Sequence, residues 1–241
     1  MNLDDYLVQL DGGNKSAPDQ LTLQPSFVQQ LLDLYADAEA RGLERGGPLL
    51  CDRATRTFAL GQVAEGLKTS MNIPVTNHAG NFGDVHAHPS TSIGHAGGYS
   101  AHSMADLRNF SKTTGKPFWI QFVTSGPWLY AMVQVNGVSK WDGTVQKFLS
   151  DRDQEEAYQM RETVMKFVGG KPKWEKMLKK FGSDPDPAQY EALYDEYKAK
   201  AQVGALMQHL SVTHCAEFAR EYNFFFYTGQ GGTMTRMLAA G

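Results

Sequence analysis

The histidines of this chain are concentrated in one short segment that is rich in glycine and serine. Four of the seven lie there: His86, His88, His95 and His102. Asp106 follows shortly afterwards. Imidazole nitrogens and carboxylate oxygens are common ligands of Zn²⁺ in proteins. Because the packing of a hydrophobic core does not require such a cluster, the segment predicts a metal site.

The first two histidines have a spacing that suits a shared metal ion. His86 and His88 are separated by one residue in the run FGDVHAHP, which is typical of a strand that leads into a loop. Side chains two residues apart on a strand point to the same face, so both imidazoles can bind one ion. Asp106 can add a carboxylate once the chain folds back. Two histidines and one carboxylate with an open fourth position are typical of a catalytic zinc site, whereas structural sites are usually closed by four ligands.

The order of these residues resembles a known signature. The run HAHP…SMAD is similar to the H-x-H-P…S-x-x-D pattern of the JAMM zinc metalloproteases (the JAB/MPN family), and the chain resembles in particular a bacterial JAB-like member of that family. The resemblance covers residues 25–140. It implies that His86, His88 and Asp106 bind Zn²⁺. The family also has a glutamate between a helix and a strand, and Glu44 in LERGGPLL stands in that context.

The resemblance implies a role for each residue in the hydrolysis of a peptide or isopeptide bond. The zinc ion would hold a water molecule and lower its pKa. Glu44 would take a proton from that water and give it to the leaving amine, although Glu65 is a nearby alternative. Ser103 would donate a hydrogen bond to the developing oxyanion. Its position ahead of a helical pattern also predicts that it caps a helix.

The stretch between the two halves of the signature, residues 89–102, is longer here than in typical members of the family. It is rich in Gly and Ser and could form a loop over the site, which bears on the substrate class. His95 and His102 match no family position. We expect them to be loop histidines, with a transient second metal site or substrate contacts as alternatives. His209, His214 and Cys215 lie in the predicted last helix and have no recognisable zinc spacing, so we expect them to take part in core or surface packing.

The elements that must position these residues are predicted by hydrophobic periodicity. We expect a helix over 25–41, a hairpin over 42–66, a strand within 82–89, a helix over 102–115 and a hairpin over 117–137. This order predicts an α/β domain whose mixed, mostly antiparallel sheet is flanked by helices. The resemblance implies the layering of JAB/MPN domains, which is similar to that of cytidine deaminases.

Composition divides the chain into four parts. Residues 1–24 are polar and predict a flexible segment, with a possible edge strand in YLVQL, and residues 25–143 predict the JAB/MPN-like core. Residues 144–222 have helical periodicity with a break at FGSDPDPAQ, which predicts about three helices inserted into or appended to the α/β domain. Residues 223–241 predict a strand followed by a flexible Gly-rich tail.

The overall composition argues against several classes of protein. The 241 residues are 41% hydrophobic and 20% charged with a net charge of -3, which is ordinary for a globular protein and gives no basic excess for binding nucleic acid. The N-terminal run lacks the pattern of a signal peptide, and the apolar windows are too short to span a membrane. Two cysteines outside any CxxC pair favour a reducing compartment. We expect a soluble cytoplasmic protein, with export without a signal peptide as an alternative.

Together these patterns predict a zinc-dependent protease or isopeptidase. Its substrate would be a protein or peptide, such as a ubiquitin-like conjugate or a cell-wall peptide, and it could act as a bacterial effector or toxin. The alternative is a catalytically silent binding module that docks a partner protein through the helices of residues 144–222. A deaminase would need a CxxC pair, and a nuclease would need carboxylate clusters and a basic groove; the sequence has neither.

Overall fold

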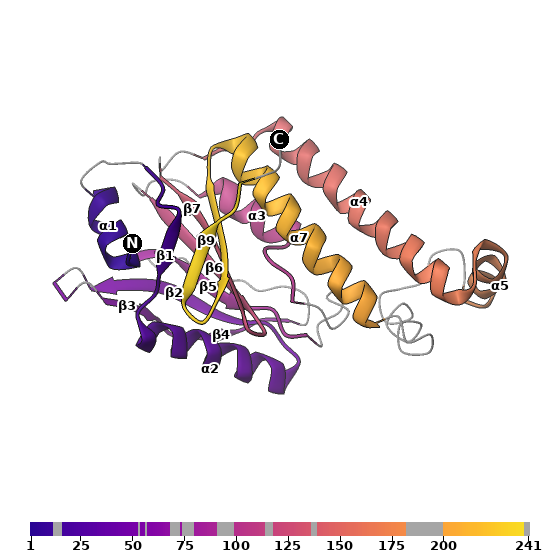
Figure 1. Ribbon diagram of the computed structural model, residues 1–241, viewed down its shortest axis with the longest axis horizontal. Helices are drawn as coiled ribbons and strands as arrows, with labels where there is room; N and C mark the ends of the chain where they lie inside the picture. The colour runs from indigo at the N-terminus through magenta and orange to yellow at the C-terminus, as the bar shows by residue number, and fades with distance from the viewer. Residues whose placement is uncertain are drawn as a thin grey trace.

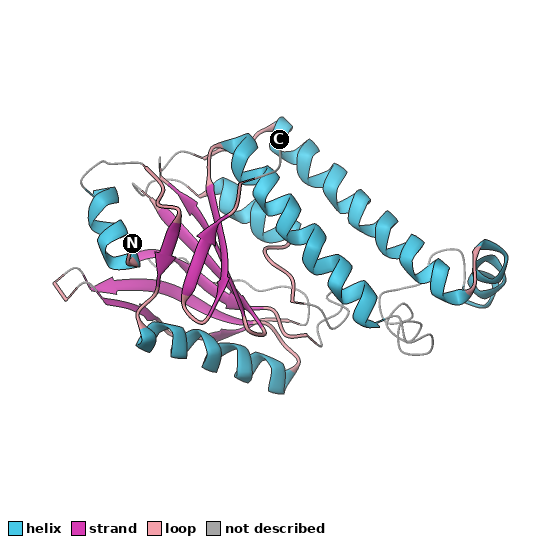
Figure 2. Ribbon diagram, viewed as in Figure 1, coloured by secondary structure: helices cyan, strands magenta, loops and turns pink. Residues whose placement is uncertain are grey.

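The fold is built on one curled sheet with helices on both of its faces (Figures 1 and 2). It is described here from a computed structural model, which covers residues 1–11, 16–52, 54–55, 57–67, 73, 80–90, 99–113, 118–135, 139–181 and 200–238. The expectation of a mixed, mostly antiparallel sheet flanked by helices is confirmed.

The sheet has the strand order β1-β9-β8-β7-β6-β5-β2-β3, with β4 paired to β2. The strands are β1 (Gln20–Thr22), β2 (Arg45–Asp52), β3 (Thr57–Leu60), β4 (Ala64–Glu65), β5 (Asn81–Ala87), β6 (Trp119–Ser125), β7 (Trp128–Gln134), β8 (Phe225–Gln230) and β9 (Thr233–Arg236). All neighbours are antiparallel except β5 and β6, which run parallel. A parallel pair needs a crossover connection, and helix α3 (Met104–Lys112) lies in that connection.

Strand residues alternate between two hydrophobic cores, one on each face of the sheet. In β7, Leu129 and Ala131 belong to the core beneath helix α2 (Pro25–Arg41), whereas Tyr130 and Met132 face the opposite core. This is the period of two that places successive strand side chains on opposite faces. Because both faces are covered, the central strands are apolar along most of their length.

The second core is closed by three helices. These are α3, the N-terminal turns of α4 (Gly143–Val168) and the C-terminal turns of α7 (Lys200–Tyr222). Phe110 of α3, Leu149 of α4 and Phe218 of α7 are all buried there. Strand β7 precedes this helical block and β8 follows it, and the two strands are hydrogen-bonded neighbours.

The remainder of the helical block extends beyond the sheet (Figure 1). Helices α4 and α7 run side by side, and α5 (Lys171–Phe181) lies at their far end. Most of the expected break at FGSDPDPAQ falls outside the residues that the structure describes. None of the helices in the described ranges combines the length and the apolar character needed to cross a membrane.

The N-terminal prediction is wrong, because residues 3–11 form helix α1 (Leu3–Asp11) and the edge strand expected in YLVQL is part of it. Leu3, Tyr6, Leu7 and Leu10 are buried at the i, i+3, i+4 and i+7 spacing of a helix. Strand β1 then pairs with β9. Helix α1 and strand β1, which lie in the segment expected to be flexible, are therefore ordered parts of the fold, and α1 packs into the first core.

The Gly-rich run near the C-terminus is also ordered where the structure describes it. Gly231 and Gly232, with φ of 61° and 87°, form the two-residue turn between β8 and β9. Such turns favour glycine because both central residues have positive φ. The prediction of a flexible tail is therefore wrong for the turn and for β9, which ends at Arg236.

Candidate metal centre

Strand β5 presents two histidines to one face of the sheet. His86 lies in the strand and His88 directly follows it, where its backbone N–H donates to the Thr124 carbonyl at 3.0 Å and so continues the β5–β6 pairing. The Ser125 hydroxyl donates to the His88 carbonyl at 3.1 Å. The two imidazole Nε2 atoms are 3.1 Å apart. The sequence prediction that both rings share a face is confirmed.

The third member of the cluster is held by the start of helix α3. Ser103 is the N-cap, as predicted, and forms a capping box with Asp106. The Asp106 N–H donates to the Ser103 Oγ at 3.2 Å, while the Ser103 N–H and hydroxyl donate to Asp106 Oδ2 at 2.8 and 2.7 Å. This box fixes the carboxylate in the first turn, where it faces both histidines.

The three side chains have the separations of a metal-binding set. His86 Nε2 lies 3.2 Å from Asp106 Oδ1, and His88 Nε2 lies 3.4 Å from Asp106 Oδ2. In a tetrahedral zinc site with bonds of about 2.0–2.1 Å, neighbouring ligand atoms are about 3.3–3.4 Å apart. One ligand atom from each residue lies within 4.8 Å of the others, so the three side chains could hold a single ion. Two neutral nitrogen ligands and one carboxylate oxygen suit Zn²⁺.

The electrostatics of the cluster favour a cation at its centre. Burial raises the pKa of the Asp106 carboxyl, but His86 and His88 outweigh it and hold this pKa well below its usual value. Burial lowers the pKa of His86, but Asp106 and Asp84 raise it well above its usual value. The carboxylates of Asp106 and Asp84 thus favour a positive charge beside them. Metal ions compete with protons for such ligands.

Glu44 joins the same electrostatic neighbourhood from the loop between α2 and β2. Its side chain is buried, and this burial raises the pKa of its carboxyl. The charges of His88 and His86 act against that rise, and the charge of Asp106 adds to it. A carboxyl group with a raised pKa beside a metal-binding cluster has the properties of a general acid or base.

The competing glutamate lies elsewhere. Glu65 is on β4, its side chain is 49% exposed, and its carboxylate forms ion pairs with Arg45 at 3.1 Å and Arg41 at 3.4 Å. It therefore belongs to a surface salt-bridge group. Of the two candidates, the structure brings Glu44 to the metal cluster.

No family model, curated protein or solved structure matches this chain. A functional assignment therefore depends on the chemistry of the site. The deciding observation is the burial of His86, His88 and Asp106 around a common point, together with a fourth acidic residue, Glu44, within their electrostatic reach.

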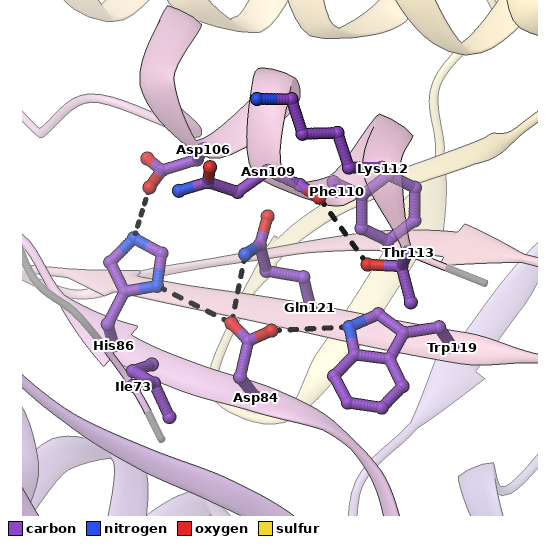
Figure 3. Close-up of a pocket in the computed structure, with 10 residues that line it drawn as sticks. All are labelled: Ile73, Asp84, His86, Asp106, Asn109, Phe110, Lys112, Thr113, Trp119 and Gln121. Atoms are coloured by element: carbon purple, nitrogen blue, oxygen red, sulfur yellow. Dashed lines mark hydrogen bonds and ion pairs between the residues drawn. The ribbon is translucent and has the colours of Figure 1, made fainter. Parts of the chain in front are cut away.

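Two further residues support the site, and the sequence analysis did not identify them. Glu39 of α2 accepts hydrogen bonds from the Ser90 N–H at 2.7 Å and the Ser90 hydroxyl at 2.5 Å, which fixes the backbone just after His88. Asp84 Oδ1 lies 3.8 Å from His86 Nδ1, on the side of the ring opposite Asp106 (Figure 3). Its spacing of two residues before His86 on the same strand is the signal that could have revealed it.

His102 lies in a loop segment as expected, but it is fully buried. Its Nε2 is 3.2 Å from the Gln121 carbonyl oxygen, and its ring packs edge-on against Phe226. Burial lowers the pKa of His102 to about 3. It is therefore a neutral core residue at physiological pH. His95 and most of the predicted loop over the site lie outside the described residues.

The histidine and cysteine of the last long helix take part in packing, as predicted. His214 Nδ1 is 2.9 Å from a carboxylate oxygen of Glu156, which joins α7 to α4. The Cys215 thiol is fully buried and donates to the His102 carbonyl at 3.6 Å. His214 therefore joins two helices of the block, whereas Cys215 attaches the block to the core of the domain.

Proposed function

We propose that this protein is a zinc-dependent metallopeptidase of the JAMM type that hydrolyses a peptide or isopeptide bond. The observation that carries the proposal is the buried cluster of His86, His88 and Asp106, which offers three ligand atoms to one ion and interacts electrostatically with Glu44. Three protein ligands with an open position are typical of catalytic zinc.

The proposed division of roles uses the properties of each side chain. His86, His88 and Asp106 would hold Zn²⁺, which when bound supplies a Lewis acid that lowers the pKa of water and polarises a carbonyl group. Glu44 takes a proton from the attacking water and later donates it to the leaving amine. Its raised pKa suits both halves of this transfer, because a catalytic group works best near its operating pH.

Ser103 is the proposed oxyanion donor. Its hydroxyl points toward the cluster, since it donates to Asp106 Oδ2 at 2.7 Å. A hydroxyl can rotate about its C–O bond, so it can donate to a substrate oxygen while Oγ still accepts the Asp106 N–H as the helix cap. Such donors stabilise the charge that develops in the transition state.

The finer architecture is part of the same proposal. We infer a JAB/MPN-like core over residues 25–143, with the helices of residues 144–222 as an insertion between two strands of the sheet. The pairing of β7 with β8 on either side of these helices supports an insertion. A protein substrate, such as a ubiquitin-like conjugate, or a cell-wall peptide would fit this chemistry, in the cytoplasm or as an exported effector.

The first experiment measures metal content and hydrolysis together. We expect purified protein to hold about one zinc ion per chain and His88→Ala to lose it. We expect Glu44→Gln to keep the zinc but to lose about 10²–10⁴-fold in the rate of cleavage of casein or ubiquitin-chain substrates. Glu65→Gln is the matched control and should leave both unchanged. Zinc-free wild-type protein, or cleavage by Glu44→Gln at the wild-type rate, would contradict the proposal.

A second candidate function is a catalytically silent binding module. Helix α4 exposes two aromatic side chains, Tyr158 and Phe167, which are 51% and 41% exposed. Exposed aromatic residues are enriched at protein interfaces. If the protein is a binding module, zinc-loaded wild-type protein should hydrolyse none of the substrates and should bind a partner protein through α4.

A further inference from the structure

A cavity of about 280 Å³ adjoins the candidate metal centre on the side of helix α3 (Figure 3). His86 and Asp106 form part of its wall, so a group bound there would lie next to the metal ligands. The polar residues that line it include two carboxylates and two side-chain amides: Asp84, Asp106, Asn109 and Gln121. The cavity is therefore rich in hydrogen-bond acceptors.

Gln121 gives this cavity an acceptor that lacks a partner. The residue is only 6% exposed, and its Nε2 donates to Asp84 Oδ1 at 2.9 Å. Its Oε1 is buried and accepts no hydrogen bond from any residue that the structure describes. Figure 3 shows this oxygen turned away from Asp84 and toward Asn109 and Asp106. A buried acceptor without a donor is unfavourable, so the arrangement favours a ligand that brings an N–H group.

Asp84 adds a negative charge at a fixed position. Its Oδ2 accepts from the Trp119 indole N–H at 3.2 Å, and its Oδ1 accepts from Gln121. A carboxylate has about four acceptor sites, so these two donors orient the group without saturating it. The register of the parallel strands, in which Asp84 lies opposite Gln121, holds the acid and the amide together.

The lysine that lines the cavity is directed elsewhere. Lys112 also lines the cavity, but its ammonium lies 4.5 Å from the centroid of the Trp141 ring. Figure 3 shows the Lys112 ammonium pointing away from Asp84 and Gln121. Lys112 therefore does not neutralise Asp84. The imidazole of His86, whose Nδ1 lies 3.8 Å from Asp84 Oδ1, is neutral when its other nitrogen binds a metal ion. In the zinc-loaded site the negative charge of Asp84 thus favours a cationic group and disfavours an acidic one.

We propose that this cavity is a substrate subsite for a cationic side chain, a lysine or arginine of the residue next to the scissile bond. Asp84 would pair with the charge, and Gln121 Oε1 would accept one of its N–H groups. Charge-assisted hydrogen bonds of this kind are stronger than neutral ones. The inference rests on the proposed function, because the cavity is a subsite only if the reacting bond lies at the adjoining metal cluster.

Matched hydroxamates test the subsite by binding alone, because a hydroxamate chelates zinc and anchors the attached side chain beside it. One pair is N-acetyl-lysine hydroxamate and N-acetyl-norleucine hydroxamate, which present the side chain on the acyl side. In the other pair, one carboxyl group of malonic acid is a hydroxamate and the other forms an amide with the α-amino group of lysine amide or norleucine amide. These compounds present the side chain on the amine side. Calorimetry on zinc-loaded protein should give about tenfold tighter binding for lysine than for norleucine in one pair.

Variants then assign that preference to the cavity. Asp84→Asn should reduce the lysine preference, which is the ratio of the two affinities, to less than about threefold. Weaker support of His86 would change both affinities together and leave this ratio unaffected. Gln121→Leu, which leaves the charge of Asp84 in place, should reduce the lysine preference by a smaller factor. Asp151→Asn, which removes an exposed carboxylate on α4, controls for net charge and should keep the full preference. Zinc content is measured for every variant, because Asp84 lies close to His86.

The outcomes separate the two proposals. Equal binding of lysine and norleucine compounds in both pairs overturns the subsite and leaves the zinc site standing. A lysine preference that survives in Asp84→Asn also overturns it. Failure of every hydroxamate to bind, with no zinc retained by the protein, overturns the proposed function and the subsite with it.

Discussion

Ser103 and Asp106 cap helix α3 reciprocally, and the carboxylate of that cap is also the third side chain of the candidate metal-binding site. Oδ2 of Asp106 accepts from Ser103, and Oδ1 lies toward His86. The local structure that starts the helix therefore also sets the geometry of a ligand. Loss of the cap should affect stability and metal binding together.

Ser103→Ala tests this coupling. We expect the free energy of unfolding of the metal-free protein to fall by about 1 kcal/mol, as for other lost N-caps, and the zinc affinity to fall as well, because the carboxylate is no longer held. Urea unfolding and competition with a zinc chelator measure the two effects. The control is Asp142→Ala, which removes the cap of α4. Asp142→Ala should lower the free energy of unfolding by a similar amount and leave the zinc affinity unchanged. An equal loss of zinc affinity in both variants would refute the coupling.

Zinc binding should release protons near neutral pH. Although burial lowers the pKa of His86, Asp106 and Asp84 raise it well above its usual value, so the metal-free imidazole carries a proton that the ion must displace. Zinc affinity should therefore fall as the pH drops and rise as the pH increases above about 6.5 toward the raised pKa. Calorimetry at pH 7 in buffers of different ionisation enthalpy should detect about one proton released per ion. Identical heats in all buffers would contradict this expectation.

His102 should make the protein sensitive to acid. Because burial lowers its folded-state pKa to about 3, the unfolded chain takes up a proton near pH 6.5 while the folded chain does not. The contribution of His102 to the free energy of unfolding is therefore present above pH 6.5 and is lost as the pH falls toward 3. Between pH 7 and pH 5 the free energy of unfolding should fall by about 2 kcal/mol from this cause.

His102→Gln isolates this effect, since an amide can donate to the Gln121 carbonyl without titrating. We expect its free energy of unfolding to decline less steeply than that of the wild type between pH 7 and pH 5. Chemical denaturation at several pH values provides the measurement. Parallel pH profiles for the two proteins would show that His102 does not titrate as proposed.

Glu39 should support zinc binding through Ser90, which lies two residues after His88. It accepts from the backbone and hydroxyl of Ser90 and from the Tyr35 hydroxyl, at 3.1 Å in the last case. Glu39→Ala should lower zinc affinity about tenfold, as is typical when supporting groups around a metal site are lost. Asp33→Ala, on the same helix, is the matched control and should have no effect. An equal loss of zinc affinity in both variants would mean that helix α2 affects zinc binding only through the stability of the fold.

The sequence was informative wherever local spacing decides the structure. The HxH spacing on a strand, the Ser103 cap and the two hairpins around β2–β3 and β6–β7 are all confirmed. These features depend on residues that are close along the chain, so their patterns are visible without knowledge of the fold.

Long-range pairing was not accessible in the same way. The contact between Asp84 and Gln121 depends on the parallel register of β5 and β6, which no local pattern reveals. The burial of His102 depends on α7 and β8 closing over it. The short apolar run in α1 satisfied both a strand and a helix pattern, and such ambiguity is inherent in short runs.

The pairing of β1 with β9 has a consequence for biosynthesis. Strand β1 lies at the edge of the sheet, and β9 is its neighbour there. Proteins are synthesised from the N-terminus at a limited rate. The backbone groups of β1 therefore cannot pair with β9 until β9 has left the ribosome. The segment that carries His86, His88 and Asp106 emerges well before that moment. Assembly of the metal ligands can thus precede closure of the sheet during translation.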